Sequence, residues 1–180
     1  MHADAERILF SEEEIKNAVK ALGKRITEDY MDEPPIIVGI LKGSFIFMSD
    51  LVREIGLNCD IDFMIAKSYG SATVSSGTVN IVKDLDTDIS GRHVLIVEDI
   101  LDTARTLTAV KDLLMDRSAK SVKIAALLDK VTAERVSDLK ADYRCFEVGN
   151  EFVVGYGLDF AEKYRGLKYI CVLRPEIYEH

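Results

Sequence analysis

The chain has 180 residues, 48% of them hydrophobic and 30% charged, and a formal net charge of −8 at pH 7. These proportions are those of an ordinary globular protein and exclude a disordered or fibrous chain. The acidic balance argues against nucleic acid or an anionic membrane as the main partner, and no apolar run is long enough to span a bilayer. We therefore expect a single domain over residues 1–180.

The first predicted helix begins at a capping box, formed by Ser11 and Glu14, and ends at residues 32–35, which include two prolines. Residues 36–41 then predict a short buried strand, and residues 42–44 predict a turn. The chain thus opens with a helix that leads directly into a strand.

Residues 45–77 predict a helix, a strand and a loop. Apolar residues at helical spacing predict an amphipathic helix that ends at Gly56. A strand is predicted over residues 61–66, and the Ser- and Gly-rich residues 67–77 predict a loop.

The second half of the chain continues this alternation. Residues 79–83 and 93–97 predict strands joined by a solvated hairpin over residues 84–92. Because residues 94–97 are apolar without alternation, we expect both faces of that strand to be covered. The remaining elements are a helix containing Leu107, Val110 and Leu114 and strands at 122–128, 145–148, 152–155 and 169–173. The pattern predicts an α/β fold with a parallel sheet and a small separate lobe built from the last strands.

Polar residues follow three of the predicted strands, at the sheet edge where ligands bind in parallel α/β folds. Lys42 and Gly43 follow the first strand of this set. Glu98 and Asp99 follow the strand before the third helix, and Lys130 follows the next strand. Mixed charge at one edge suits a substrate that carries phosphates together with hydroxyls or a metal ion.

Residues 102–106 lead into the third helix. Free backbone N–H groups and the helix dipole make such an end an anion site, and Thr103, Arg105 and Thr106 add side-chain donors. The two carboxylates just upstream are placed to accept hydrogen bonds from a diol or to meet Mg²⁺. A phosphate site beside a diol site describes a phosphorylated pentose.

Each of these residues has an ordinary explanation when it is taken alone. Asp102 suits a helix N-cap, and Arg105 and Lys130 suit surface cations. Their joint placement at one sheet edge favours a shared site. The cysteines Cys59, Cys145 and Cys171 are odd in number and form no C-x-x-C pair, which predicts reduced thiols in a cytoplasmic protein.

Residues 94–107, VLIVEDILDTARTL, resemble the phosphoribosyl-pyrophosphate motif of type I phosphoribosyltransferases. Four further segments resemble the hypoxanthine-guanine phosphoribosyltransferases, in matching order and spacing from about residue 8 to residue 175; they are 41–44, 68–70, 128–130 and 152–164. The resemblance implies the type I phosphoribosyltransferase fold, in which helices flank a mostly parallel central sheet and the chain termini form a small hood lobe.

The resemblance also implies an activity. The enzyme would transfer the phosphoribosyl group from phosphoribosyl pyrophosphate to hypoxanthine or guanine, giving IMP or GMP and pyrophosphate, with Mg²⁺ as cofactor. It would serve purine salvage in the cytoplasm as a homo-oligomer, a dimer or a tetramer. Two alternatives remain open, namely a preference for xanthine and a non-catalytic regulator built on the same fold.

The resemblance assigns phosphoribosyl pyrophosphate to Lys42, Gly43, Glu98, Asp99, Asp102, Thr103, Ala104, Arg105, Thr106 and Arg165. Glu98 and Asp99 would hold the ribose hydroxyls and, with Asp159, the metal ion. The segment 102–106 would cradle the 5′-phosphate, and Asp102 would exchange a proton with purine N7 as the catalytic residue.

The implied base site uses four further residues. Lys130 would donate a hydrogen bond to the 6-oxo group, and Phe152 would stack on the purine. The backbone of Val153 would meet the edge of the base, with Asp159 nearby.

Three local features accompany these roles. A flexible lid loop over residues 67–78 would place Ser68 and Tyr69 over the pyrophosphate. A non-proline cis peptide is implied at residues 41–42. Ala104 stands where the motif often has glycine, and because alanine tolerates positive φ poorly, we expect helical backbone at this position.

Overall fold

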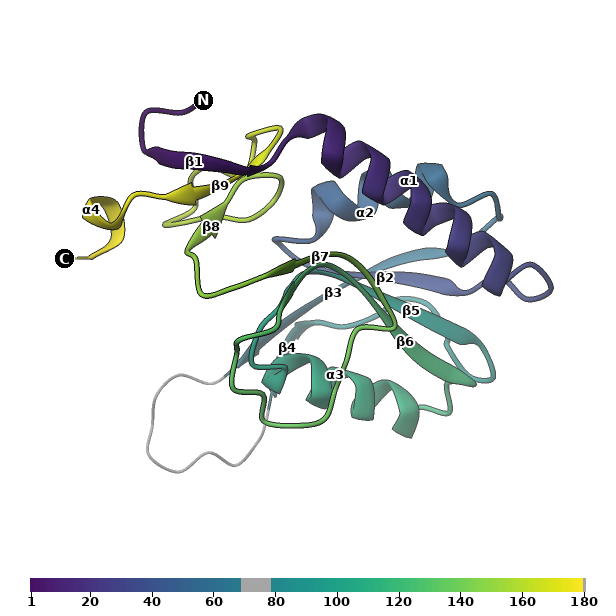
Figure 1. Cartoon of the computed structure of the whole chain (residues 1–180). Helices are drawn as coiled ribbons and strands as arrows, with labels where there is room; N and C mark the ends of the chain where they lie inside the picture. The colour runs from purple at the N-terminus through teal and green to yellow at the C-terminus, as the bar shows by residue number, and fades with distance from the viewer. Residues whose placement is uncertain (69–78, 180) are drawn as a thin grey trace.

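The computed structural model describes residues 1–68 and 79–179 (Figure 1). Its elements are β1 (Ala5–Phe10), α1 (Glu12–Asp29), β2 (Ile36–Ile40), α2 (Phe45–Glu54), β3 (Ile61–Ser68), β4 (Val79–Lys83), β5 (His93–Leu101), α3 (Arg105–Asp116), β6 (Ser121–Lys130), β7 (Tyr143–Val148), β8 (Val153–Val154), β9 (Ile170–Leu173) and α4 (Pro175–Tyr178). The capping box of Ser11 and Glu14 is present at the start of α1, as predicted.

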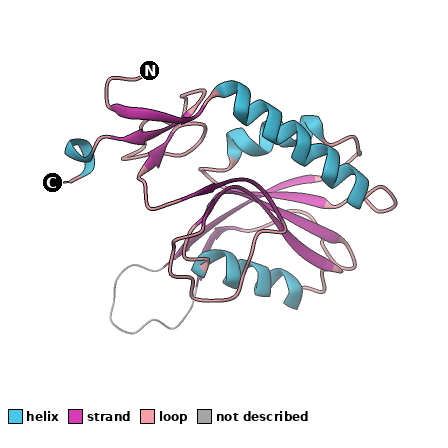
Figure 2. Cartoon of the chain, in the orientation of Figure 1, coloured by secondary structure: helices cyan, strands magenta, loops and turns pink. Residues whose placement is uncertain are grey.

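The central sheet has six strands in the order β4-β3-β2-β5-β6-β7. All neighbours in it pair in parallel except β4, which runs antiparallel to β3 at one edge. Helices α1 and α2 cover one face and α3 covers the other (Figure 2). The predicted mostly parallel sheet flanked by helices is therefore confirmed.

Alternation along β5 distributes its side chains between two apolar cores. Val94 and Ile96 pack in the cluster that includes α3, whereas Leu95 and Val97 pack in the cluster under α1 and α2. All four are completely buried, so the prediction that both faces of this strand are covered is confirmed.

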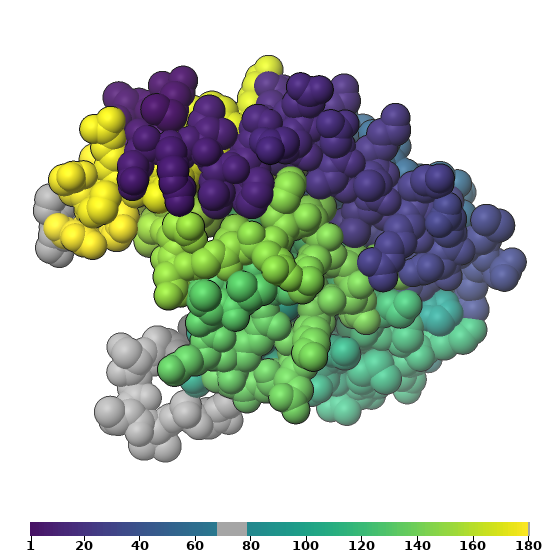
Figure 3. All heavy atoms as spheres, in the orientation of Figure 1, coloured from purple at the N-terminus to yellow at the C-terminus, as the bar shows by residue number. Residues whose placement is uncertain are grey.

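A second sheet joins the two ends of the chain. Its three strands lie in the order β1-β9-β8, all antiparallel, and we call this sheet the hood. Ala5, Val154, Cys171 and Leu173 form its buried apolar centre. Figure 3 shows the N-terminal residues packed against the C-terminal ones at one end of the molecule. The predicted hood lobe from the termini is confirmed, although β1 and α4 were not predicted as elements.

The predicted hairpin between residues 79–83 and 93–97 is wrong. β4 pairs with β3, and β5 lies in the middle of the sheet between β2 and β6. Asp62 on β3 explains the difference, because its buried carboxylate accepts the backbone N–H groups of Asp86 and Thr87, both at 2.9 Å. These bonds hold the segment after β4 against β3.

Two other boundaries move. β3 continues through Lys67 and Ser68, which were predicted as loop, because both pair with β4. The rest of the predicted lid, with Tyr69, lies outside the described residues. β5 and β6 extend through Leu101 and Lys130. Glu98, Asp99 and Lys130, which were expected just after these strands, therefore lie at the carboxyl ends of the strands themselves.

Replacement of Asp62 by Asn is expected to reduce the free energy of unfolding by about 2 kcal/mol at neutral pH, because the amide cannot accept all of these N–H groups. Burial alone raises the pKa of Asp62, but hydrogen bonds from the backbone of Thr87 and Phe63 outweigh it and hold the pKa below 3.8. The stabilisation is therefore present above pH 3.8 and is lost as the pH falls through the lower folded-state pKa. Urea unfolding of both proteins across this range measures it.

Asp60→Asn is the matched control, since Asp60 lies two residues away and, among the described residues, its side chain pairs with Arg92 at the surface. Equal unfolding free energies for the Asp62→Asn and Asp60→Asn variants at pH 7 would contradict this account of the turn.

Candidate functional site

The carboxyl ends of β2 and β5 open into a cavity of about 340 Å³. All ten residues predicted for phosphoribosyl pyrophosphate line it, and Asp159 joins them from the connection between β8 and β9. The full predicted set is Lys42, Gly43, Glu98, Asp99, Asp102, Thr103, Ala104, Arg105, Thr106 and Arg165. Residues more than 120 positions apart in the sequence thus share one cavity.

The turn between β2 and α2 forms the first wall of the cavity. The peptide bond between Leu41 and Lys42 is cis, as predicted. Ser44 is completely buried, and its hydroxyl donates to the carbonyl oxygen of Ile40 at 2.6 Å. The serine therefore closes the turn from inside.

Gly43 has no room for a side chain. A Cβ atom at this position would lie 1.6 Å from Oδ2 of Asp99, which is far closer than two non-bonded atoms can approach. It is also approached from the other side, because a Cβ at Gly157 would lie 2.2 Å from the carbonyl oxygen of Gly43. Glycine at residue 43 thus lets the carboxylate of β5 lie directly against the backbone of the turn.

The adjacent carboxylates of Glu98 and Asp99 form the acidic centre of the cavity. Burial, and then the neighbouring charge of Asp99, raise the pKa of Glu98 well above its usual range. Asp99 in turn accepts the backbone N–H of Ile100 at 2.9 Å. Hydroxyl donors or a cation placed against this pair would relieve the repulsion between the two charges.

The segment 102–106, which we call the phosphate segment, forms the opposite wall. Ala104 has φ 64° and ψ 0°, so the expectation of helical backbone at this residue is wrong. Its side chain is buried in the core beneath α3, and its carbonyl oxygen accepts the N–H of Thr108 at 2.8 Å. The left-handed conformation costs alanine about 1 kcal/mol, and burial of the side chain in the core offsets this cost.

Helix α3 begins directly after Ala104, the residue with the left-handed backbone conformation. Ala104 is the N-cap residue and makes no side-chain capping bond, so the alternative of Asp102 as an N-cap is wrong. Asp102 and Thr103 instead are exposed at the cavity. The first N–H groups of a helix lack intrahelical partners, and here they lie at the cavity beside Arg105.

The connection between β8 and β9, residues 155–169, brings the remaining charges. Arg165 pairs with Asp159 at 2.8 Å and donates to the carbonyl oxygen of Gly157 at 2.8 Å. Its Nε is buried and finds no hydrogen-bond partner within the described residues. Lys42, which lines the cavity, pairs with Glu162 at 3.0 Å.

Glu162 was missed by the sequence analysis. It holds both Lys42 and Arg165, the two cations assigned to pyrophosphate. Positive φ angles occur at Ala161, Glu162 and Tyr164. None of these three residue types predicts a left-handed backbone conformation. The pairing of Glu162 with Lys42 therefore depends on local backbone angles that residue propensities do not predict.

Of the four residues predicted for the base, Asp159 lines this cavity, whereas Lys130, Phe152 and Val153 do not. Lys130 ends β6 beside Val148 of β7, and Val153 pairs with Val172 in the hood. Phe152 is 37% exposed, stacks on Tyr178 with 4.5 Å between ring centroids, and meets Phe160 edge-on. Ser68 ends β3, and Tyr69 lies outside the described residues.

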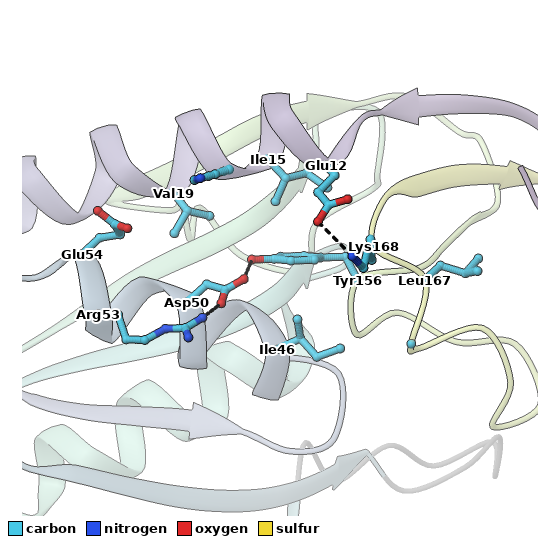
Figure 4. A pocket seen from close by; sticks show the side chains of 12 residues that line it. Glu12, Ile15, Val19, Ile46, Asp50, Arg53, Glu54, Tyr156, Leu167 and Lys168 are labelled. Atoms are coloured by element: carbon cyan, nitrogen blue, oxygen red, sulfur yellow. Dashed lines mark hydrogen bonds and ion pairs between the residues drawn. The ribbon is translucent and has the colours of Figure 1, made fainter.

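A second cavity, of about 530 Å³, lies between α1, α2 and the 155–169 connection, and none of the predicted site residues that the structure describes lines it. Figure 4 shows Tyr156 lying there between the two helices, with its hydroxyl 2.5 Å from Asp50. Burial, and then this contact, raise the pKa of Tyr156 above its usual range. The tyrosine ties the hood connection to α2.

The described ranges, 1–68 and 79–179, hold neither a candidate metal cluster nor a helix that could span a membrane. They contain no cluster of three or more His, Cys, Asp or Glu side chains arranged to hold a metal ion. No helix in them is both long and apolar enough to cross a bilayer.

Comparison with known proteins gives consistent matches over nearly the whole chain. The family model described as phosphoribosyl transferase domain matches residues 8–161. The chain is 52% identical to the hypoxanthine-guanine phosphoribosyltransferase of Bacillus subtilis (strain 168), with 99% of each chain covered, and 52% identical to that of Streptococcus pneumoniae (strain ATCC BAA-255 / R6), with 98% covered. A hypoxanthine phosphoribosyltransferase structure from Staphylococcus aureus superposes with a TM-score of 0.95 at 47% identity, covering 100% of this chain and 97% of that one.

Proposed function

Because this chain belongs to the hypoxanthine-guanine phosphoribosyltransferase family, we propose that it makes IMP or GMP from hypoxanthine or guanine. The phosphoribosyl group comes from phosphoribosyl pyrophosphate, pyrophosphate leaves, and the reaction serves purine salvage. One observation carries the proposal above all, namely that one cavity gathers all ten residues assigned to phosphoribosyl pyrophosphate from three distant segments.

In the proposed complex the phosphate segment binds the 5′-phosphate through backbone N–H groups, the hydroxyls of Thr103 and Thr106 and the guanidinium of Arg105. Glu98 and Asp99 accept hydrogen bonds from the ribose hydroxyls. Burial, and then the neighbouring charge of Asp99, raise the pKa of Glu98, and hydrogen-bond donors against the pair would stabilise its charged form, which supports this role.

The same carboxylates, with Asp159, are the proposed ligands of Mg²⁺. Mg²⁺ keeps several waters and uses few protein carboxylates when substrate phosphates are present, so the ion need not be held by all three carboxylates at once. The ion would neutralise charge on the leaving pyrophosphate.

Charge develops at two places during the proposed transfer. The ribose C1 becomes oxocarbenium-like, by analogy with glycoside chemistry, and pyrophosphate gains negative charge. Lys42 and Arg165 line the cavity and pair with Glu162 and Asp159, which supports a role for these two cations in binding the leaving pyrophosphate. In the proposed complex pyrophosphate takes the place of the Glu162 carboxylate at Lys42.

For the base, we propose that Lys130 donates to the 6-oxo group, Phe152 stacks on the ring and the Val153 backbone meets its edge. Asp102 exchanges the proton of purine N7. Adenine carries a 6-amino donor, which would face the lysine donor and leave both groups unpaired.

The test is a spectrophotometric assay with Mg²⁺, phosphoribosyl pyrophosphate and equal concentrations of hypoxanthine, guanine, xanthine or adenine. Rapid turnover of hypoxanthine and guanine but not adenine is expected. A higher kcat/KM for xanthine than for hypoxanthine would favour the xanthine-preferring alternative. Absence of turnover with every base would favour a regulator without catalytic activity.

Replacement of Lys130 by Met is expected to raise the KM for hypoxanthine about 10- to 100-fold, because the 6-oxo group loses a charged donor. Lys20→Met, on the exposed face of α1, is the control for removing one lysine charge. Steady-state kinetics with each base measures the change. An unchanged KM for hypoxanthine and unchanged rejection of adenine would remove Lys130 from this role.

We further propose that residues 1–180 act as one phosphoribosyltransferase domain in a cytoplasmic dimer or tetramer. The support is the family match over almost the whole chain and the three free cysteines, which form no disulfide with one another. Sedimentation velocity at micromolar concentration distinguishes these states from a monomer.

A further inference from the structure

Residues 131–142 connect β6 to β7 without helix or strand, and we call this segment the brace. In Figure 1 it runs beside the N-terminal end of α3. It starts directly after Lys130 and touches the phosphate segment, so it links the two places that the proposed function assigns to the base and to the 5′-phosphate.

The brace is anchored on a buried carboxylate. Asp129, the residue before Lys130, is only 2% exposed and pairs with both Arg135 of the brace and Arg144 of β7. Because side chains alternate along a strand, Asp129 and Lys130 point to opposite faces of β6. Fixing Asp129 on one face therefore fixes the direction in which Lys130 leaves the strand on the other.

Arg135 also shapes the brace itself. Its second terminal nitrogen donates to the carbonyl oxygen of Leu139 at 3.1 Å, which closes the backbone between these residues. The N–H of Ala133 donates to the carbonyl oxygen of Lys130 at 3.1 Å and folds the start of the brace back onto β6. The side chain of Arg135 is only 19% exposed, in contrast to 48% for Arg144.

The turn closed by Arg135 contacts the phosphate segment at Thr103 and the first turn of α3 at Thr108. The N–H of Val136 donates to the carbonyl oxygen of Thr103 at 3.1 Å. The hydroxyl of Thr108 donates to the carbonyl oxygen of Ala104 at 2.8 Å, which uses its one hydrogen, so Ser137 donates to Thr108 at 2.7 Å. The left-handed turn at Ala104 is thereby supported from the brace.

We infer that Arg135 is a positioning residue that holds Lys130 and the Thr103–Ala104 turn at a set separation, so that base and 5′-phosphate of one nucleotide are bound together. This inference rests on the proposed function for the identity of the two ligands. The linkage itself, from Asp129 through Arg135 to Thr103, rests on the contacts alone.

The experiment compares three variants with one control. Arg135→Met removes the contacts to both Asp129 and Leu139. Arg135→Lys keeps a charge for Asp129 but cannot reproduce the two-pronged guanidinium. Ser137→Ala removes the hydrogen bond to Thr108 and the long one that Ser137 accepts from the N–H of Leu139, and it leaves Arg135 in place. Arg144→Met is the control, since it removes an Asp129 partner of equal charge outside the brace.

We expect Arg135→Met to raise the KM for both hypoxanthine and phosphoribosyl pyrophosphate about tenfold, with kcat changed less than about threefold. Arg135→Lys should recover the KM for hypoxanthine but not that for phosphoribosyl pyrophosphate. Ser137→Ala should raise only the KM for phosphoribosyl pyrophosphate, by about threefold. Arg144→Met should change neither KM more than about twofold.

A second readout is independent of turnover. Amide hydrogen exchange of the peptide containing residues 100–107 should become about tenfold faster in Arg135→Met and should stay unchanged in Arg144→Met. Exchange in this peptide that is the same in both variants, or KM values that are unchanged in all three brace variants, would overturn the inference. A wild-type protein that turns over no base would instead contradict the proposed function, while the exchange result would still decide whether Arg135 links the two segments.

Discussion

Replacement of Asp102 by Asn is expected to lower kcat for IMP formation at least 100-fold, while the KM for phosphoribosyl pyrophosphate changes less than about threefold. The amide keeps the size of the carboxylate but cannot accept a proton, and a positioned general base contributes about 10²- to 10⁴-fold to a rate. Asp102 is exposed at the cavity and does not cap α3, so its removal leaves the start of the helix unchanged.

Asp112→Asn is the matched control, because Asp112 lies exposed on α3 and does not line the cavity. Pre-steady-state kinetics separates the chemical step from product release in both variants. A chemical step that keeps its wild-type rate in Asp102→Asn across the pH range would assign the proton transfer to another group.

Replacement of Gly43 by Ala is expected to lower kcat/KM about 100-fold or more. The added Cβ would lie 1.6 Å from Oδ2 of Asp99, so the carboxylate has to leave its position between β5 and the turn. Asp99, which we propose to bind the ribose hydroxyls and the metal ion, would then be displaced from its place in the cavity. Steady-state kinetics with varied phosphoribosyl pyrophosphate and Mg²⁺ measures the loss.

Gly166→Ala is the control for this substitution, since a Cβ at Gly166 has no atom within 4 Å. It adds the same methyl group in the 155–169 connection without a steric conflict. Activity within threefold of wild type in Gly43→Ala would show that Asp99 has no required place beside the turn.

Regular periodicity and short motifs allowed most of the fold to be predicted. The capping box of α1, the covered strand β5 and the parallel order of sheet and helices follow from local patterns. The placement of β4 depends instead on Asp62, a single buried carboxylate whose partners lie 24 and 25 residues away in the sequence. No local pattern in the sequence identifies such a long-range contact.

The candidate site shows the same division. The residues of the phosphate segment and the acidic pair were predictable, because strand ends and helix starts share one edge of a parallel sheet. The backbone of Ala104 was not, since core packing outweighs its intrinsic preference. Glu162 was not either, because its pairing with Lys42 joins residues 120 positions apart through three left-handed backbone conformations.

The strand order of the hood has a consequence for how the protein matures during synthesis. β9 lies between β1 and β8, so the first and last strands of the chain pair with each other. The parallel sheet, whose strands all lie between Ile36 and Val148, can assemble while later residues are still in the ribosome. The hood cannot form until β9 has left the ribosome, and the anchoring of Arg165 at the cavity depends on the hood. A nascent chain therefore forms its phosphate segment before Arg165 takes its place at the cavity.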